Sequence, residues 1–346
     1  MTNLQEISQN NLSISLSNLP IDPELVRDIQ ARLNKIGFID MTAIALGTFD
    51  ANTSTALAKF QGVARRLPTD DIDRSFANKL LDITKDVVLP TAPTVDVTIA
   101  LTESVGKNGK NIAAEVLIVK NRLADLGFPV SRTSNMGDVT IEIIKLFQAI
   151  INDKKNLNIG GNVDGRIDPN GKTHRALEKS YAPRWQEMLP GAVQEGFINS
   201  DYLALAPKQD GDFGTTWMVE TVRAAGEIYR NYLNTHPNAA LIGVNDISTS
   251  TGGNFPPHAE HQVGLCCDLY LPRKDGNLGR IEVGDSQYDR AAMRAILQAF
   301  RSQTKHKVVD VFLNDDELRT EGLCTFAIGH YNHAHISIRP SVLSMF

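Results

Sequence analysis

Apolar residues at helical spacing dominate the first part of the chain. Four of them share one face of an expected helix over residues 23–38: Leu25, Ile29, Leu33 and Ile36. This three- and four-residue spacing is typical of an amphipathic helix, and Gly37 is a stop signal near its end. The pattern predicts a second helix that begins with residues 53–61 and a third, short helix over 74–81. Alternating apolar and polar residues over 11–17 favour a short strand.

The same order of elements recurs further along the chain, which indicates an internal repeat. Three features of the first copy have counterparts in the second: Leu33 in Leu123, Gly37-Phe38 in Gly127-Phe128, and Phe60-Gln61 in Phe147-Gln148. The alternating lead-in recurs over residues 95–101, and a linker with two prolines is expected over 86–94. The chain then divides into a lead-in (1–20), two helical domains (21–88 and 95–182), a connector (183–210) and a final domain (211–346).

The final domain mixes both periodicities. The pattern predicts helices over 217–233 and 289–304, and strands over 238–245, 308–314 and 333–338, with a turn at 315–318. Such a mixture favours an α+β domain. We expect two small three-helix all-α domains followed by an α+β domain with a central antiparallel sheet.

Composition narrows the class of protein. The 346 residues are 42% apolar and 22% charged, as in ordinary globular proteins, and the net charge of −5 offers no basic field for nucleic acid. No apolar run approaches the roughly 20 residues that span a bilayer, so membrane insertion is not expected. The N-terminus lacks the basic and apolar regions of a signal peptide.

Three cysteines do not make a disulfide framework. Cys266 and Cys267 read as small buried residues on a strand. Ligation of a metal by one of them, or a bond to Cys324, are the alternatives.

Histidines concentrate in two segments. The chain has eight histidines, and five of them lie within residues 257–268 and 330–335. Asp268 belongs to the first segment, and imidazole with carboxylate is a ligand set that suits zinc. Because residues two apart on a strand share a face, His333 and His335 are expected to point the same way. Two ligands from one loop and a third from a distant strand are typical of a catalytic zinc site, which keeps a fourth position for water.

The two helical copies resemble the three-helix peptidoglycan-binding domain. The resemblance covers about 21–85 and 111–180 and rests on the order helix, Gly-Phe, helix with Phe-Gln, Asp-Gly turn and closing helix. The second copy has the Asp164-Gly165 turn, whereas the first carries Gly47-Thr-Phe-Asp50 in its place. The resemblance implies binding to the cell wall; helical spacers without a ligand are the alternative.

Residues 211–340 resemble the penicillin-insensitive murein endopeptidases, within the wider superfamily of lysostaphin-like and D-Ala-D-Ala peptidases. The motifs that carry the resemblance are Asp246-Ile-Ser, Gly252-Gly253, His258-x-x-His261-Gln-x-Gly-Leu-x-x-Asp268 and His330-x-x-His333-x-His335. The resemblance implies one zinc ion held by His261, Asp268 and His335. Cys266 and Cys267 depart from the family, which usually has Asp and Val there; neither position is a family ligand.

The second histidine motif offers no carboxylate as general base. Related carboxypeptidases use a glutamate shortly before the last two histidines, but residues 329–332 contain no carboxylate. We therefore expect His330 to act as base and His333 to stabilise the oxyanion or share the proton transfer. A structural hydrogen bond is the alternative role for His330. His258, Ser248 and Gln262 are expected to orient a ligand or contact substrate.

These expectations describe a zinc-dependent murein endopeptidase that cuts a stem or cross-link peptide. The sequence is compatible with a phage lysin or an injected antibacterial effector, made in the cytoplasm and acting on the wall after release or injection. Its expected partner is peptidoglycan, with delivery machinery or an immunity protein as further possibilities. Alternatives are a D,D- or L,D-carboxypeptidase, an inactive wall-binding protein, and a non-haem iron oxygenase, because two histidines and a carboxylate also bind Fe(II).

Overall fold

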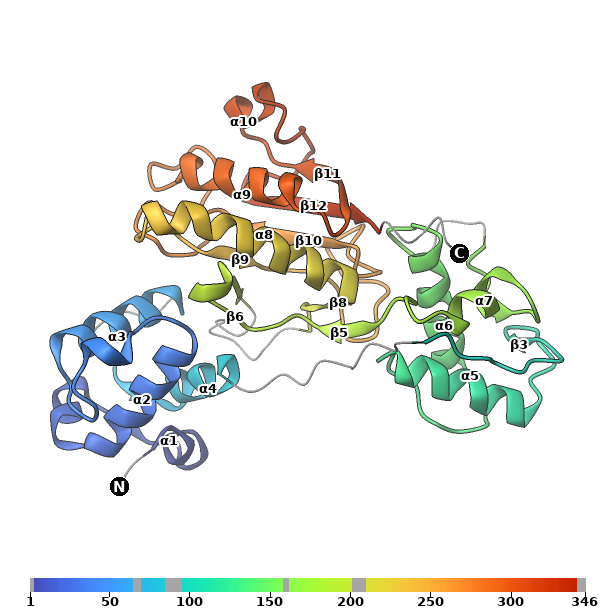
Figure 1. Ribbon diagram of the computed structural model, residues 1–346, viewed down its shortest axis with the longest axis horizontal. Coiled ribbons are helices and arrows are strands. Elements are labelled where there is room, and N and C mark those ends of the chain that lie inside the picture. The colour runs from blue at the N-terminus through green and yellow to red at the C-terminus, as the bar shows by residue number, and fades with distance from the viewer. Residues whose placement is uncertain (1–2, 65–69, 85–94, 158–161, 201–209, 341–346) are drawn as a thin grey trace.

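The protein has a helical N-terminal region and a C-terminal six-stranded mixed sheet (Figure 1). The computed structural model describes residues 3–64, 70–84, 95–157, 162–200 and 210–340. We name residues 3–84 the first helical unit, 95–182 the second helical unit and 183–340 the sheet unit. The linker expected over 86–94 lies outside the described residues. Among the described residues, no helix is both long and apolar enough to cross a membrane.

The first helical unit contains the helices that the apolar spacing predicts. They are α2 (Pro23–Lys35), α3 (Ala51–Val63) and α4 (Arg74–Ile83), and they follow α1 (Leu4–Asn10). Helix α2 begins where the Asp22 side chain accepts a hydrogen bond from the Leu25 amide, and the chain leaves it through Gly37 at φ +77°. The short strands β1 (Ser13–Ile14) and β2 (Ile72–Asp73) pair antiparallel.

Helix α1 is absent from the sequence-based expectation. Its start is a capping box, in which Asn3 and Glu6 bond each other's backbone amides. Only two of its residues, Leu4 and Ile7, are buried. Two apolar positions are too few for periodicity to reveal a helix, so the capping box is the only local signal.

The second helical unit repeats this arrangement. It consists of α5 (Ala113–Asp125), α6 (Asp138–Ile151) and α7 (Lys172–Glu178), with β3 (Val105–Gly106) paired to β4 (Arg166–Ile167). Residues 95–101 form no strand, because Val97 and Ile99 direct their amides to the backbone and side chain of Glu178.

The repeated Phe-Gln pair has one structural role in both units. Phe60 and Phe147 are fully buried in the cores, each edge-on to another phenylalanine. The following glutamines fasten the helix to the segment before the closing helix: Gln61 donates to the Asp70 carbonyl, and Gln148 donates to the Arg166 carbonyl. The repeated Phe-Gln pair is therefore explained by packing and hydrogen bonding within each unit, without a ligand.

The large sheet has the strand order β11-β12-β10-β9-β7-β6. Its strands are β6 (Gly191–Ala192), β7 (Phe197–Asn199), β9 (Ile242–Val244), β10 (Cys266–Tyr270), β11 (Lys307–Phe312) and β12 (His333–Arg339). The expectation of an antiparallel sheet is wrong for one pair, since β7 and β9 are parallel. The cause is the crossover helix α8 (Thr216–Thr235), because a helical crossover returns the chain in the same direction.

The segment expected as a connector, 183–210, contributes strands. Both β6 and β7 come from it, and β5 (Trp185–Glu187) pairs with β8 (Phe213–Thr215). Helices α8 and α9 (Arg290–Ser302) pack side by side against the sheet (Figure 1). Asp315 to Leu318, expected as a turn, begins the short helix α10 (Asp316–Thr320), which Asp315 caps.

The second helical unit shares one hydrophobic core with the sheet unit. Trp185 lies at the junction: its ring stacks on Phe128 at 5.9 Å, and its amide donates to the Leu126 carbonyl. Gly127, at φ +85°, allows this approach, because a Cβ there would lie 2.2 Å from the Trp185 carbonyl oxygen. The first helical unit has its own core, which four residues of the sheet unit join: Ala192, Ile198, Ala240 and Leu278.

Candidate metal site

Strand register brings the two histidine segments together. Strands β10 and β12 pair antiparallel with Asp268 opposite His335 and Tyr270 opposite His333. Directly opposite residues of an antiparallel pair project from the same face of the sheet. Asp268 and His335 therefore meet although 67 residues separate them in the chain.

His261 reaches the same point from the loop that precedes β10. Its Nδ1 lies 3.1 Å from the Ile247 carbonyl oxygen, which fixes the ring. The loop is held in turn where the Gly253 amide donates to the Gln262 carbonyl at 2.8 Å. Backbone contacts therefore place this histidine, and its Nε2 is turned towards Asp268.

Three potential ligand atoms form a small triangle. His261 Nε2 is 3.0 Å from Asp268 Oδ1, His335 Nδ1 is 2.9 Å from the same oxygen, and the two nitrogens are 3.0 Å apart. All three side chains are buried. Ligand atoms about 2.0–2.1 Å from a tetrahedral zinc are about 3.3 Å from one another, so a small expansion of this triangle would accommodate the ion.

The hydrogen bond on the outer side of the His261 ring decides which of its nitrogens carries a lone pair. A carbonyl oxygen only accepts, so the Ile247 contact assigns the proton of His261 to Nδ1 and leaves its Nε2 as acceptor. His335 Nε2 lies 3.0 Å from Ser337 Oγ, and its Nδ1 faces the triangle. Two imidazole nitrogens and a carboxylate oxygen thus converge on one point, which needs a proton or a metal cation.

The electrostatics of the cluster follow from this convergence. Burial raises the pKa of Asp268, but His261 and His335 outweigh it and hold that pKa well below its usual range. Burial lowers the pKa of His335. Hydrogen bonds to the ring, of which the one to Asp268 has the largest effect, outweigh burial and raise this pKa to about 12. Asp268 is therefore ionised, and without a metal a proton is retained on the opposite imidazole.

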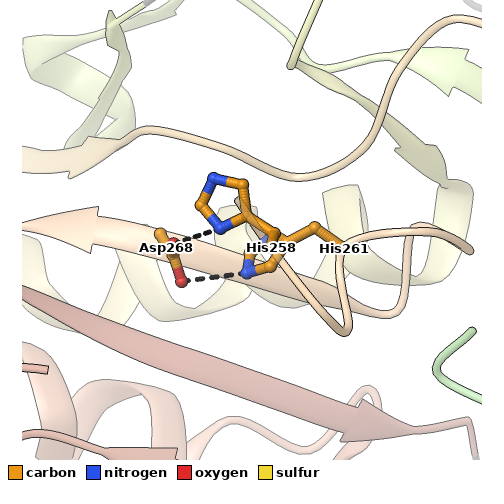
Figure 2. Close-up of side chains that lie close together, drawn as sticks. All are labelled: His258, His261 and Asp268. Carbon is orange, nitrogen blue, oxygen red and sulfur yellow. Dashed lines mark ion pairs between the residues drawn. The ribbon is translucent and has the colours of Figure 1, made fainter. Parts of the chain in front are cut away.

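His258 approaches Asp268 from the other carboxylate oxygen. Its Nδ1 is 3.5 Å from Asp268 Oδ2, and Figure 2 shows His258 and His261 both directed at this carboxylate. His258, His261 and Asp268 offer ligand atoms within 4.8 Å of one another and could hold a metal ion. His258 Nε2 also lies 3.4 Å from Asp246 Oδ2, and this contact raises the pKa of His258.

A cavity of about 420 Å³ opens beside the cluster. His330 and His333 lie on its wall with their ring centres 4.7 Å apart. Burial lowers the pKa of both, so both are neutral at pH 7. His330 Nδ1 lies 3.1 Å from the Ile328 carbonyl oxygen, which leaves its Nε2 as a proton acceptor.

The structure brings six of the eight sequence-derived site residues to this cavity: His258, His261, Asp268, His330, His333 and His335. Ser248 lies apart from it, fully buried, and its backbone pairs with Asp212. Gln262 also faces elsewhere, because its side-chain oxygen accepts from the Leu157 amide of the second helical unit at 3.1 Å. Both therefore support the fold around the site rather than line the cavity.

Glu260 is the ionisable residue of the cavity lining that the sequence analysis did not single out. It lines the cavity and places Oε2 3.5 Å from His335 Nε2. Its position directly before His261 was the available signal, but a lone carboxylate in a loop reads as solvent-exposed.

Comparison with protein-family models and with curated proteins finds no match to this chain.

Proposed function

We propose that the chain is a zinc-dependent murein endopeptidase, with two three-helix wall-binding domains followed by a metallopeptidase domain. The observation that carries the proposal is the triangle of His261, Asp268 and His335 atoms, 2.9–3.0 Å apart, at the wall of an open cavity. Such a donor set fits zinc, and an ion held by these three residues would have a fourth position for water or substrate. Zinc supplies Lewis acidity, which polarises a peptide carbonyl and makes water more acidic.

The remaining histidines supply proton transfer. His330 Nε2 accepts the proton of the attacking water, since its Nδ1 proton is engaged by the Ile328 carbonyl. His333 Nδ1 lies 2.7 Å from Asn332 Oδ1, which orients the ring beside His330. Because the Nδ1 proton of neutral His333 is engaged by Asn332, its Nε2 shares the proton acceptance with His330. Once it carries that proton, His333 stabilises the negative charge on the carbonyl oxygen or passes the proton to the leaving amine. His258 steadies Asp268 through the second carboxylate oxygen.

Peptidoglycan is the proposed substrate because the helical repeat resembles wall-binding domains. The Phe-Gln packing common to both units supports a shared three-helix design. The metal donors and the two neutral histidines support hydrolysis of a peptide bond, and the same residues would serve at any peptide bond of the stem or cross-link.

Mass spectrometry of soluble fragments from purified sacculi tests the proposal. An endopeptidase converts cross-linked dimers to monomers, whereas a carboxypeptidase removes a terminal residue and leaves the cross-links. Wild-type protein is compared with the His261→Ala variant and with His236→Ala, a control at an exposed histidine that follows α8 and does not line the cavity. Unchanged sacculi after treatment with zinc-loaded wild type would refute the proposal and favour an inactive wall-binding protein.

A further inference from the structure

The outer nitrogen of His335 lies between two acceptors. Its Nε2 is 3.0 Å from Ser337 Oγ and 3.5 Å from Glu260 Oε2. Ser337 is fully buried on β12, whereas Glu260 is partly exposed on the loop that also carries His261. One Nε2–H can be shared between the two oxygens.

We propose that Glu260 is a positioning residue for the metal site, holding the Nε2–H of His335 so that Nδ1 points at Asp268 and His261. The inference rests on the proposed zinc site and extends it to a residue outside the three ligands. Carboxylates that accept from the outer N–H of a ligating histidine fix both the ring and its tautomer.

Ser337 cannot perform this role by itself. A hydroxyl both donates and accepts, and Ser337 Oγ also lies 3.2 Å from Cys266 Sγ. Ser337 could therefore donate to an unprotonated Nε2, which would place the ring proton on Nδ1 and block that nitrogen as a ligand. An ionised carboxylate only accepts, so Glu260 excludes the tautomer in which the ring proton is on Nδ1.

The position of Glu260 gives it two ways to act on the site. It is the residue before His261, so the loop that delivers one ligand also orients another. Its contact spans from the loop to β12, on the opposite ring edge from Asp268. Movement of the loop would therefore alter both ligating imidazoles together.

A second metal ion is the competing explanation. Glu260, Cys266 and His335 offer ligand atoms within 4.8 Å of one another. That arrangement would require His335 to lose its Nε2 proton and bind metal through both nitrogens. It predicts two ions per chain, whereas the positioning role predicts one.

The experiment measures zinc binding to the full chain by competition with a chromophoric chelator. The variants are Glu260→Gln, which keeps the shape, and Glu260→Ala; Glu282→Gln is the control at an exposed glutamate. We expect affinity to fall about 10- to 100-fold in both Glu260 variants, the usual effect of losing such a partner. The control should match wild type, and all variants should keep a cooperative unfolding transition without metal.

A spectroscopic readout separates positioning from general support. In zinc-loaded wild type, the His335 Nε2–H proton should resonate downfield, and it should move upfield in Glu260→Gln. Activity should return at saturating zinc, because the carboxylate does not touch the reacting bond.

Equal zinc affinity in wild type and both Glu260 variants would overturn the positioning role alone. Two zinc ions per wild-type chain, falling to one in Cys266→Ser, would also overturn it in favour of the second metal site. Failure of the proposed function looks different: wild type would then bind zinc no more tightly than His261→Ala.

Discussion

Asp268 Oδ1 lies 2.9 Å from His335 Nδ1, across the neighbouring antiparallel strands β10 and β12. The contact exists because the register places the two residues directly opposite each other. A one-residue slip would turn one of these side chains to the other face of the sheet. Cys267 and Ile336, the next opposed pair, are fully buried on that other face and oppose such a slip.

The first prediction concerns the metal. Asp268→Asn removes the charge shared by the two imidazoles and should abolish tight zinc binding and sacculus hydrolysis together. His261→Ala should do the same, because it removes one corner of the triangle. Metal analysis of the purified proteins checks both, with His236→Ala as control. Full zinc content in Asp268→Asn would show that the ion lies elsewhere.

The second prediction concerns the base. His330→Ala should lower kcat by about 10²- to 10⁴-fold, the usual size of a general-base contribution, while zinc content stays near that of wild type. His335→Ala should lose the metal as well. Steady-state kinetics on a defined cross-linked muropeptide, with metal analysis of the same samples, separates the two classes. If His330→Ala keeps full kcat, His333 becomes the candidate.

The third prediction concerns the shared core. A chain of residues 95–346 keeps that core intact and should fold, with a modest loss of stability where Ile198 and Leu278 become exposed. A chain of residues 183–346 loses the Phe128 partner of Trp185 and should be insoluble or partly unfolded. Circular dichroism and thermal unfolding check this. A cooperative transition in 183–346 at the wild-type temperature would contradict it.

The fourth prediction concerns acid stability. Asp315 is fully buried, bonds Arg290 Nε at 2.8 Å and caps α10. Burial raises the pKa of Asp315, but the Arg290 contact and the α10 amides outweigh it and lower that pKa. A carboxyl whose folded pKa is depressed stabilises the fold above the unfolded value of about 3.9, and this contribution is lost as the pH falls through the folded pKa.

Asp315→Asn should therefore destabilise the protein at pH 7 by about 1–3 kcal/mol, the cost of an impaired buried hydrogen-bonding group. It should also weaken the dependence of stability on pH below about 4. Denaturant unfolding from pH 3 to 7 measures both effects. The control is Asp316→Asn, because Asp316 is 93% exposed. An equal change in the two variants would exclude the buried ion pair as the cause.

Local patterns predicted most helices and placed the histidines. The spacing of Leu25, Ile29 and Leu33 reports one buried face, and the structure buries all three. The two histidine segments could be joined because period-two alternation put His333 and His335 on one side of a strand. These signals are contained within short stretches of chain.

The parts that escaped prediction depend on distant contacts. Strands β6 and β7 have two and three residues, too few for alternation to appear, and they form because β7 pairs with β9 and β6 pairs with β7. The contact of the Gln262 side chain with the Leu157 amide joins residues that lie 105 positions apart in the chain. Glu260 gains its significance only from the position of His335.

The junction at Trp185 has a consequence for how the protein would meet its substrate. A module on a flexible tether searches a volume, and its reach depends on the length of the linker. Here the second helical unit is packed to the sheet unit through one core, so packing holds the distance and angle between that unit and the cavity. Under the proposed function, the protein would discriminate among cross-links by their orientation relative to the bound glycan strand, as a template of fixed dimensions does.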